Sequence, residues 1–431
     1  MIRPRWYALG NLGSNIFSQA FATFIIFFYV DHLHAPLAGI TLAMAIQSVW
    51  HAVLNPVVGQ ISDRTRTRYG RRIPYIAVLS IPLGIIFFLL WDPFVPGQWL
   101  SLYFLVAVLL FDLTYLMVVL NWTSLFPEMF QSIADRTRAQ APRQIVGVIA
   151  LLVGVAMPPI LYGHWGYPAM GAILGTIGTL GFLFSLWGSQ EHSLAPVPLA
   201  TPPCRLSLFD TWNLLTGFRG YRRFLVMNFL VQLTLGIVPA VLPFYAKYVL
   251  HISHSLLSAL LSSIFVTALV LVVPWSRWIK TQGSHRGIRQ TIILLMIGLI
   301  PFWVTRNVIG IFLAAIVLGL GLSGFLVLAD VLMAEVIDMD AQQHRQRREG
   351  IFYGINGFIL RLGVSIQALL LYAVLHSTHF QPNRSGQAPI AVEDGFRILI
   401  SLVPLIFLIT AYVVIRRHDV PESQISATTP P

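Results

Sequence analysis

Residues 55–72 read NPVVGQISDRTRTRYGRR, an apolar segment that ends abruptly in one aspartate and five arginines before the next apolar segment begins. Arginines at this density stay on the cytoplasmic side of a bilayer. The stretch therefore predicts a short cytoplasmic loop between two membrane-spanning helices.

The composition of the whole chain agrees with a protein that is solvated mainly by lipid. Of its 431 residues, 56% are apolar and only 10% are charged, and the mean hydropathy is +0.74. A helix needs about 20 mostly apolar residues to cross the hydrocarbon core. Twelve such segments are expected, centred near Ala20, Ile46, Ile85, Asp112, Leu152, Ile177, Leu235, Phe265, Ile297, Val317, Ser365 and Phe407.

The net charge of +11 would suit a nucleic-acid partner, but the placement of the basic residues argues against one. Loops assigned alternately to two sides place 23 Lys and Arg on one side and four on the other, namely Lys247, Arg306, Arg384 and Arg397. This asymmetry predicts a multi-pass protein of the plasma or inner membrane with both termini in the cytoplasm. The N-terminal MIRPRWYALG has no secretory-signal features, so the first span is expected to be retained.

A proline-rich polar stretch divides the spans six and six. We expect an N-terminal six-helix bundle at 1–189, a cytoplasmic linker at 190–223, a C-terminal six-helix bundle at 224–415 and a cytoplasmic tail at 416–431. Leu208, Trp212 and Leu215 share one face of a helix in the linker, which predicts a short helix on the membrane surface. The single Cys204 allows no internal disulfide, and no metal or cofactor is expected.

Several blocks of the chain resemble one family of carriers. Residues 335–361, EVIDMDAQQHRQRREGIFYGINGFILR, resemble the loop between helices 10 and 11 of the glycoside-pentoside-hexuronide:cation symporters, the family of the melibiose carrier. Further support comes from YALGNLGSN at 7–15, the block at 55–76, SLFPEM at 124–129 and ADRTRAQAPRQ at 134–144.

The resemblance implies an all-α major facilitator fold with 12 transmembrane helices in two six-helix bundles. It also implies alternating access through a central cavity lined by spans 1, 2, 4, 5, 7, 10 and 11. The partners expected on this basis are the lipid bilayer and a small-molecule substrate, which would be a sugar, a glycoside, a pentoside or a uronate.

The chain departs from the family at its cation site. Asn15, His51, Asn55 and Val119 stand where sodium-coupled members carry aspartates. Because Na⁺ needs several oxygen ligands, these residues make sodium coupling in the usual manner unexpected. Two alternatives to sodium coupling follow. Transport could be coupled to a proton carried by His51 or Asp112, or it could be facilitated diffusion without a coupling ion.

Polar residues at helical spacing mark a face of the first two spans. Asn15 and Gln19 lie four residues apart on span 1, and His51 and Asn55 lie four apart on span 2. We interpret both pairs as lining a substrate pathway. The alternative is hydrogen bonding between neighbouring helices.

Three charged residues complete the candidate substrate site. Asp112 lies in the middle of span 4, where a charge needs a partner or a proton. Arg143 and Arg361 match the basic residues that the family carries on spans 5 and 11, and a guanidinium suits carboxylates and sugar hydroxyls. The alternatives are an ion pair of Arg361 with Asp112 or Asp330, and snorkelling of Arg143 to the surface.

Trp122 lies one residue from the family's sugar-stacking aromatic, and it is otherwise interpreted as an interfacial anchor. Gly319, Gly321 and Gly324 predict either bends for alternating access or close helix packing.

Charged loop residues of both halves are candidates for a cytoplasmic gate that forms when the two bundles rock together. The alternative is that these residues are solvated and serve only to fix the orientation of the helices in the membrane. The residues are Asp63, Arg64, Arg68, Arg71 and Arg72 in the first half and Asp338, Asp340, Arg347 and Arg348 in the second.

Three rival functions differ from a sugar carrier. A carrier of another amphiphile, such as a lysolipid, is the nearest rival. A channel or a non-transporting sensor is a rival of another class. An enzyme is not expected, because the twelve histidines are scattered and the acidic residues lie mainly in loops.

Overall fold

The computed structural model describes residues 4–130, 133–191, 218–344, 349–382 and 389–416, and every regular element in these ranges is a helix. In the first half the helices are α1 (Pro4–Ala8), α2 (Gly10–Phe27), η1 (Phe28–His32), α3 (Leu37–Arg64), α4 (Ile73–Trp91), η2 (Gly97–Trp99), α5 (Leu100–Met129), α6 (Ile133–Ser185) and η3 (Leu186–Gly188). In the second half they are α8 (Arg219–Tyr245), η4 (Ala246–Leu250), α9 (His254–Gln282), α10 (Ser284–Val304), α11 (Val308–His344), α12 (Glu349–Ser377), α13 (Ile390–Arg397), η5 (Ile398–Leu402) and α14 (Val403–Arg416).

Eleven helical segments of the described chain are long and apolar enough to cross a membrane, whereas twelve are expected from the sequence. The difference lies in α6, whose apolar span runs over 51 residues, Arg138–Gly188. At 1.5 Å per residue this span measures about 77 Å, more than twice the hydrocarbon thickness. Its backbone leaves the helical conformation at Gly166, where φ is +82°, so α6 turns back and contains the fifth and sixth predicted segments.

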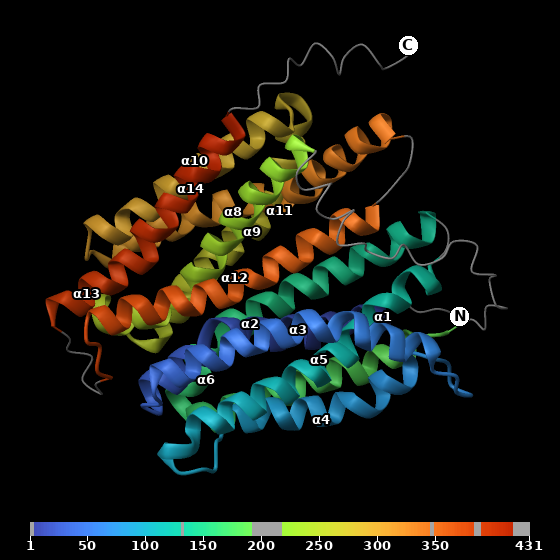
Figure 1. The fold of residues 1–431 in the computed structure, drawn as a ribbon, viewed down its shortest axis with the longest axis horizontal. Helices are drawn as coiled ribbons and strands as arrows, with labels where there is room; N and C mark the ends of the chain where they lie inside the picture. Colours follow the sequence, from blue (N-terminus) through green and yellow to red (C-terminus); the bar gives the residue numbers. More distant parts are fainter. Residues whose placement is uncertain (1–3, 131–132, 192–217, 345–348, 383–388, 417–431) are drawn as a thin grey trace.

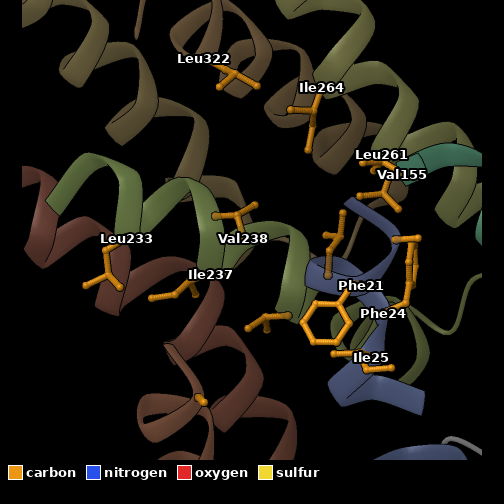
Figure 2. Close-up of a cluster of buried hydrophobic side chains, with 14 of the residues drawn as sticks. Phe21, Phe24, Ile25, Val155, Leu233, Ile237, Val238, Leu261, Ile264 and Leu322 are labelled. Carbon is orange, nitrogen blue, oxygen red and sulfur yellow. The ribbon is translucent and has the colours of Figure 1, made fainter. Parts of the chain in front are cut away.

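The two halves pack along three pairs of helices. α2 packs on α8, α3 on α12, and α6 on α9. Figure 2 shows part of this interface, where Phe21 and Phe24 of α2, Val238 of α8, Val155 of α6 and Leu261 of α9 belong to one cluster of buried apolar side chains. Apolar packing between long helices therefore joins the two halves.

The start of α1 and the end of α14 lie at one end of the helical bundle, which we call the terminal end, and the turn between α2 and α3 lies at the other, the distal end (Figure 1). In Figure 1, α10 and α14 of the second half incline away from the first half toward the terminal end. The predicted surface helix at Leu208–Leu215 and most of the predicted linker lie outside the described residues. The predicted domain boundaries stay a prediction.

Candidate functional site

A cavity of about 180 Å³ lies between the two halves. It is lined by side chains from α2, α3, α5, α8, α12 and η5: Ser18, Phe21, Ala22, Ile26, Met44, Gln47, His51, Phe111, Asp112, Tyr115, Ile237, Ala240, Val241, Arg361, Val364, Gln367, Leu371 and Leu399. These six helices correspond to predicted spans 1, 2, 4, 7, 11 and 12. Predicted spans 5 and 10 contribute none of the described lining residues, whereas span 12 contributes Leu399.

The polar centre of the cavity is a buried cluster on the first half. His51 Nδ1 lies 2.6 Å from Asp112 Oδ1, and Gln47 Nε2 donates to the same oxygen at 3.2 Å. Asp112 and His51 are 3% and 1% exposed, so the pair is shielded from bulk solvent. The cluster forms because Gln47 and His51 lie one turn apart on α3, which packs against α5.

Each member of this cluster keeps one atom without a hydrogen-bond partner among the described residues. These atoms are Gln47 Oε1, His51 Nε2 and Asp112 Oδ2. Buried polar atoms are normally paired, because leaving one unpaired costs about 1–3 kcal/mol. Three such atoms at one cavity point to a ligand, a proton or water as the missing partner.

The second half brings a cationic group to the same cavity. Arg361 of α12 lines it, and no carboxylate in the described part of the chain lies within 4.0 Å of its guanidinium. The ion pair of Arg361 with Asp112 or Asp330 considered from the sequence is therefore not formed. Ser48 Oγ of α3 donates to the Arg361 backbone carbonyl at 2.9 Å, which ties the two halves beside the cavity.

Four other predicted site residues lie away from the described lining of the cavity. The amide of Asn15 donates to the carbonyl of Asn11 at 3.2 Å, and that of Asn55 donates to the carbonyl of His51 at 3.4 Å. Gln19 packs beside Gly154 of α6. Arg143 lies on α6, toward the terminal end.

Arg143 lies against aromatic rings. Its guanidinium carbon is 5.0 Å from the centre of the Trp122 ring and 4.9 Å from that of Phe126. Trp122 is fully buried and stacks on Tyr7 with ring centres 5.0 Å apart. The interpretation of Trp122 as an interfacial anchor is therefore wrong, because the ring is enclosed by helices of the first half.

A charged contact joins the two halves at the distal end. Asp31 in η1 is 4% exposed and accepts hydrogen bonds from Lys247 Nζ at 2.7 Å and from the Tyr248 hydroxyl, both in η4. The rings of Phe27 and Phe244 meet edge to face directly beneath, at 4.9 Å. Sequence reasoning missed this contact, although an aspartate and a lysine at the ends of spans 1 and 7 were a visible signal.

At the terminal end, the described ion pairs of the predicted gate join residues of the first half. Arg71 and Arg72 contact Glu128 at 2.6 and 2.9 Å, and Arg72 contacts Asp63 at 3.2 Å. The Glu191 carboxylate accepts from the backbone amides at the start of α4. Arg347 and Arg348 lie outside the described residues, and the pairing of the two halves at this end stays a prediction.

Comparison with known proteins agrees with this architecture. The family described as MFS/sugar transport protein matches residues 6–422. The isoprimeverose transporter of Lactiplantibacillus pentosus is 23% identical, over 90% of this chain and 83% of its own. The putative glycoside/cation symporter YagG of Escherichia coli is 21% identical, over 98% and 92%.

Two more distant likenesses bear on the fold and on the rival substrates. The sodium-dependent lysophosphatidylcholine symporter 1 of Gallus gallus is 19% identical, over 97% of this chain and 86% of its own. The crystal structure of a mutant of the nucleoside transporter NupG superposes with a TM-score of 0.70 at 12% identity, covering 96% of this chain and 99% of that one. With a family match over nearly its whole length, a helical bundle that spans a membrane several times and a cavity between two halves, the chain belongs to the MFS/sugar transport protein family of membrane carriers.

Proposed function

We propose that this carrier moves a sugar, a glycoside, a pentoside or a uronate across the cell membrane by alternating access, with both termini in the cytoplasm. One observation carries the proposal. The cavity between the halves presents Gln47, His51 and Asp112 from one side and Arg361 from the other, with unpartnered polar atoms on the first-half side. A polyhydroxylated substrate offers donors and acceptors that suit polar side chains of this kind.

The chemistry of the cavity favours a small polar substrate over a lysolipid. Its volume of about 180 Å³ lies below the range of roughly 300–1,000 Å³ typical of sites for drug-sized ligands. Arg361 suits the carboxylate of a uronate or a pair of sugar hydroxyls. Among the relatives compared above, the two that match with higher identity are named as an isoprimeverose transporter and a putative glycoside/cation symporter, and the lysophosphatidylcholine symporter is more distant.

The remaining predicted residues would serve the path between the cavity and the terminal end. Asn15, Gln19, Asn55 and Arg143 belong to α2, α3 and α6, which all take part in the contact between the two halves. In this proposal the substrate passes Asn15, Asn55 and Arg143 before it reaches Asp112 and Arg361, whereas Gln19 follows the lining residue Ser18 on α2.

We further propose that the coupling ion, where there is one, is a proton carried by the His51–Asp112 pair. A sodium ion would need several oxygen ligands, whereas the cluster offers the oxygens of Asp112 and Gln47 and an imidazole. A buried imidazole in contact with a carboxylate is a proton-binding pair that can also respond to a bound substrate.

The charged contact at the distal end supports alternating access. Asp31 is bonded to Lys247 across the halves. In this proposal the contact helps to separate the cavity from the distal face, which the positive-inside rule assigns to the outside. The distal contact then belongs to the state of the carrier that is open to the cytoplasm.

Counterflow in proteoliposomes tests the proposal. The purified protein is loaded with unlabelled D-glucose, D-xylose, D-glucuronate or lysophosphatidylcholine, and entry of the same labelled compound is followed at pH 6, 7 and 8. We expect exchange with at least one sugar or uronate, since a carrier exchanges labelled for unlabelled substrate and a channel or sensor does not. Exchange of the lysolipid alone would refute the substrate class.

A further inference from the structure

Gln367 is a polar residue of the second half that the proposed function leaves without a role. It lies on α12 and is partly buried in the cavity wall, six residues beyond Arg361. The two residues are the only polar ones among the described lining residues of the second half. A rise of 1.5 Å per residue places Gln367 about 9 Å deeper along the helix than Arg361.

The surroundings of this amide are apolar. Ile237 and Val241 of α8, Val364 of α12 and Leu399 of η5 line the same cavity. Within the described part of the chain the amide of Gln367 has no hydrogen-bond partner. The amide therefore presents a donor and an acceptor together in a mainly apolar wall, where a hydrogen bond to a ligand is stronger than in water.

Gly236 of α8 allows the amide to lie there. A Cβ atom built on Gly236 would fall 2.0 Å from Nε2 and 2.8 Å from Cδ of Gln367. The amide therefore packs directly on the α8 backbone, in space that any other residue would fill. Glycine weakens a helix interior relative to alanine, so its presence here is explained by this contact.

We infer that Gln367 determines substrate specificity by pairing with a hydroxyl group deep in the cavity, and that Gly236 is its positioning residue. The inference rests on the proposed function, because it assigns a ligand to the same site. Arg361 and the Asp112 cluster hold the substrate toward the terminal end, and the Gln367 amide donates to and accepts from a hydroxyl farther along the molecule. A substrate without that hydroxyl leaves the amide unpaired and is discriminated against.

The test measures KM and kcat of counterflow for whichever of D-glucose, D-xylose and D-glucuronate the wild type moves, and for its single-deoxy analogues. We expect Gln367→Leu to raise KM for the parent sugar about tenfold, the worth of one or two hydrogen bonds. For one deoxy analogue the same variant should leave KM within about twofold, because that analogue never made the bond.

Gly236→Ala should change KM for the parent sugar and the deoxy analogues in the same way as Gln367→Leu. The double variant should show the same KM values as Gln367→Leu alone. The matched control is Gly363→Ala on α12, where a Cβ would meet Phe229 at an ordinary 3.5 Å. Thermal unfolding in detergent shows whether each variant is folded.

The outcomes separate this inference from the proposed function. If wild type exchanges none of the three sugars, both fail. Two results with a wild type that exchanges one of the sugars would overturn the inference alone. In the first, the folded Gln367→Leu variant keeps the wild-type KM. In the second, it loses affinity equally for the parent sugar and for every deoxy analogue.

Discussion

At the scale of single residues, Asp112 governs the electrostatics of the cavity. It is 3% exposed and bonded to Gln47 and His51, and the cost of a charge at this depth is offset by these bonds. One of its oxygens and His51 Nε2 have no hydrogen-bond partner in the described structure.

Replacing Asp112 tests whether the pair couples transport to protons. Asp112→Asn keeps the shape and the acceptor oxygen but cannot be protonated. We expect the variant to lose substrate accumulation driven by a pH gradient but to keep counterflow, with the affinity for substrate lowered about tenfold. We expect the same result for His51→Gln. Gradient-driven accumulation that is unchanged in both variants, measured in proteoliposomes, would refute proton coupling through this pair.

Trp122 shows how a residue can matter for stability rather than for surface anchoring. Its ring is fully buried between Tyr7 and Arg143, and its indole nitrogen donates to the Tyr7 carbonyl at 3.3 Å. We expect Trp122→Ala to destabilise the protein by about 3–5 kcal/mol. The same change at Trp165, which is 66% exposed, is the control and should lower the melting temperature in detergent far less.

At the scale of helices, the glycines of α11 serve close packing. A Cβ on Gly319 would lie 2.4 Å from the carbonyl oxygen of Ile264 in α9, and one on Gly321 would lie 2.7 Å from Leu295 in α10. These contacts favour the packing interpretation of the glycines over bending, because the backbone of α11 approaches its neighbours where no side chain fits.

Alanine substitutions separate the packed glycines from the others. Gly319→Ala should destabilise the fold by about 1–3 kcal/mol, because a backbone carbonyl must move. Gly354→Ala on α12, where nothing lies within 4 Å of the added methyl, should be neutral or stabilise the helix by up to about 1 kcal/mol. Equal melting temperatures of the two variants would contradict the close approach of α9 and α11.

At the scale of the whole molecule, the two halves are held at the distal end by a charged contact. Lys247 and Asp31 join η4 to η1 at 2.7 Å, next to the Phe27–Phe244 ring contact. Removing Lys247 leaves the buried Asp31 without its cationic partner, at a cost of up to about 3–5 kcal/mol. The contact therefore stabilises the state that is closed at this end, and breaking it should favour the opposite state.

Distances between spin labels measure this shift. In a Cys204→Ser background, labels at Ala38→Cys and Ser255→Cys report the separation of the halves at the distal end, since both sites are exposed. We expect Asp31→Asn and Lys247→Met to move the distribution toward longer distances. Glu393→Gln is the control, because its partner Arg306 at 2.8 Å belongs to the same half, and a similar shift in that variant would contradict the assignment.

The sequence by itself determined that the chain crosses a membrane many times and that its family is one of sugar carriers. It also determined that Asp112, His51 and Arg361 lie within apolar segments, where polar and charged side chains need partners. Long apolar segments and polar residues within them are local properties, and lipid leaves few ways to satisfy them. The tertiary structure alone decided that Asp112 bonds His51, that Arg143 faces Trp122 and not the described cavity, that Gln367 packs on Gly236, and that Asp31 meets Lys247. These pairs join helices far apart in the chain, and the spacing of residues along one helix fixes which face they share but not which helix that face meets.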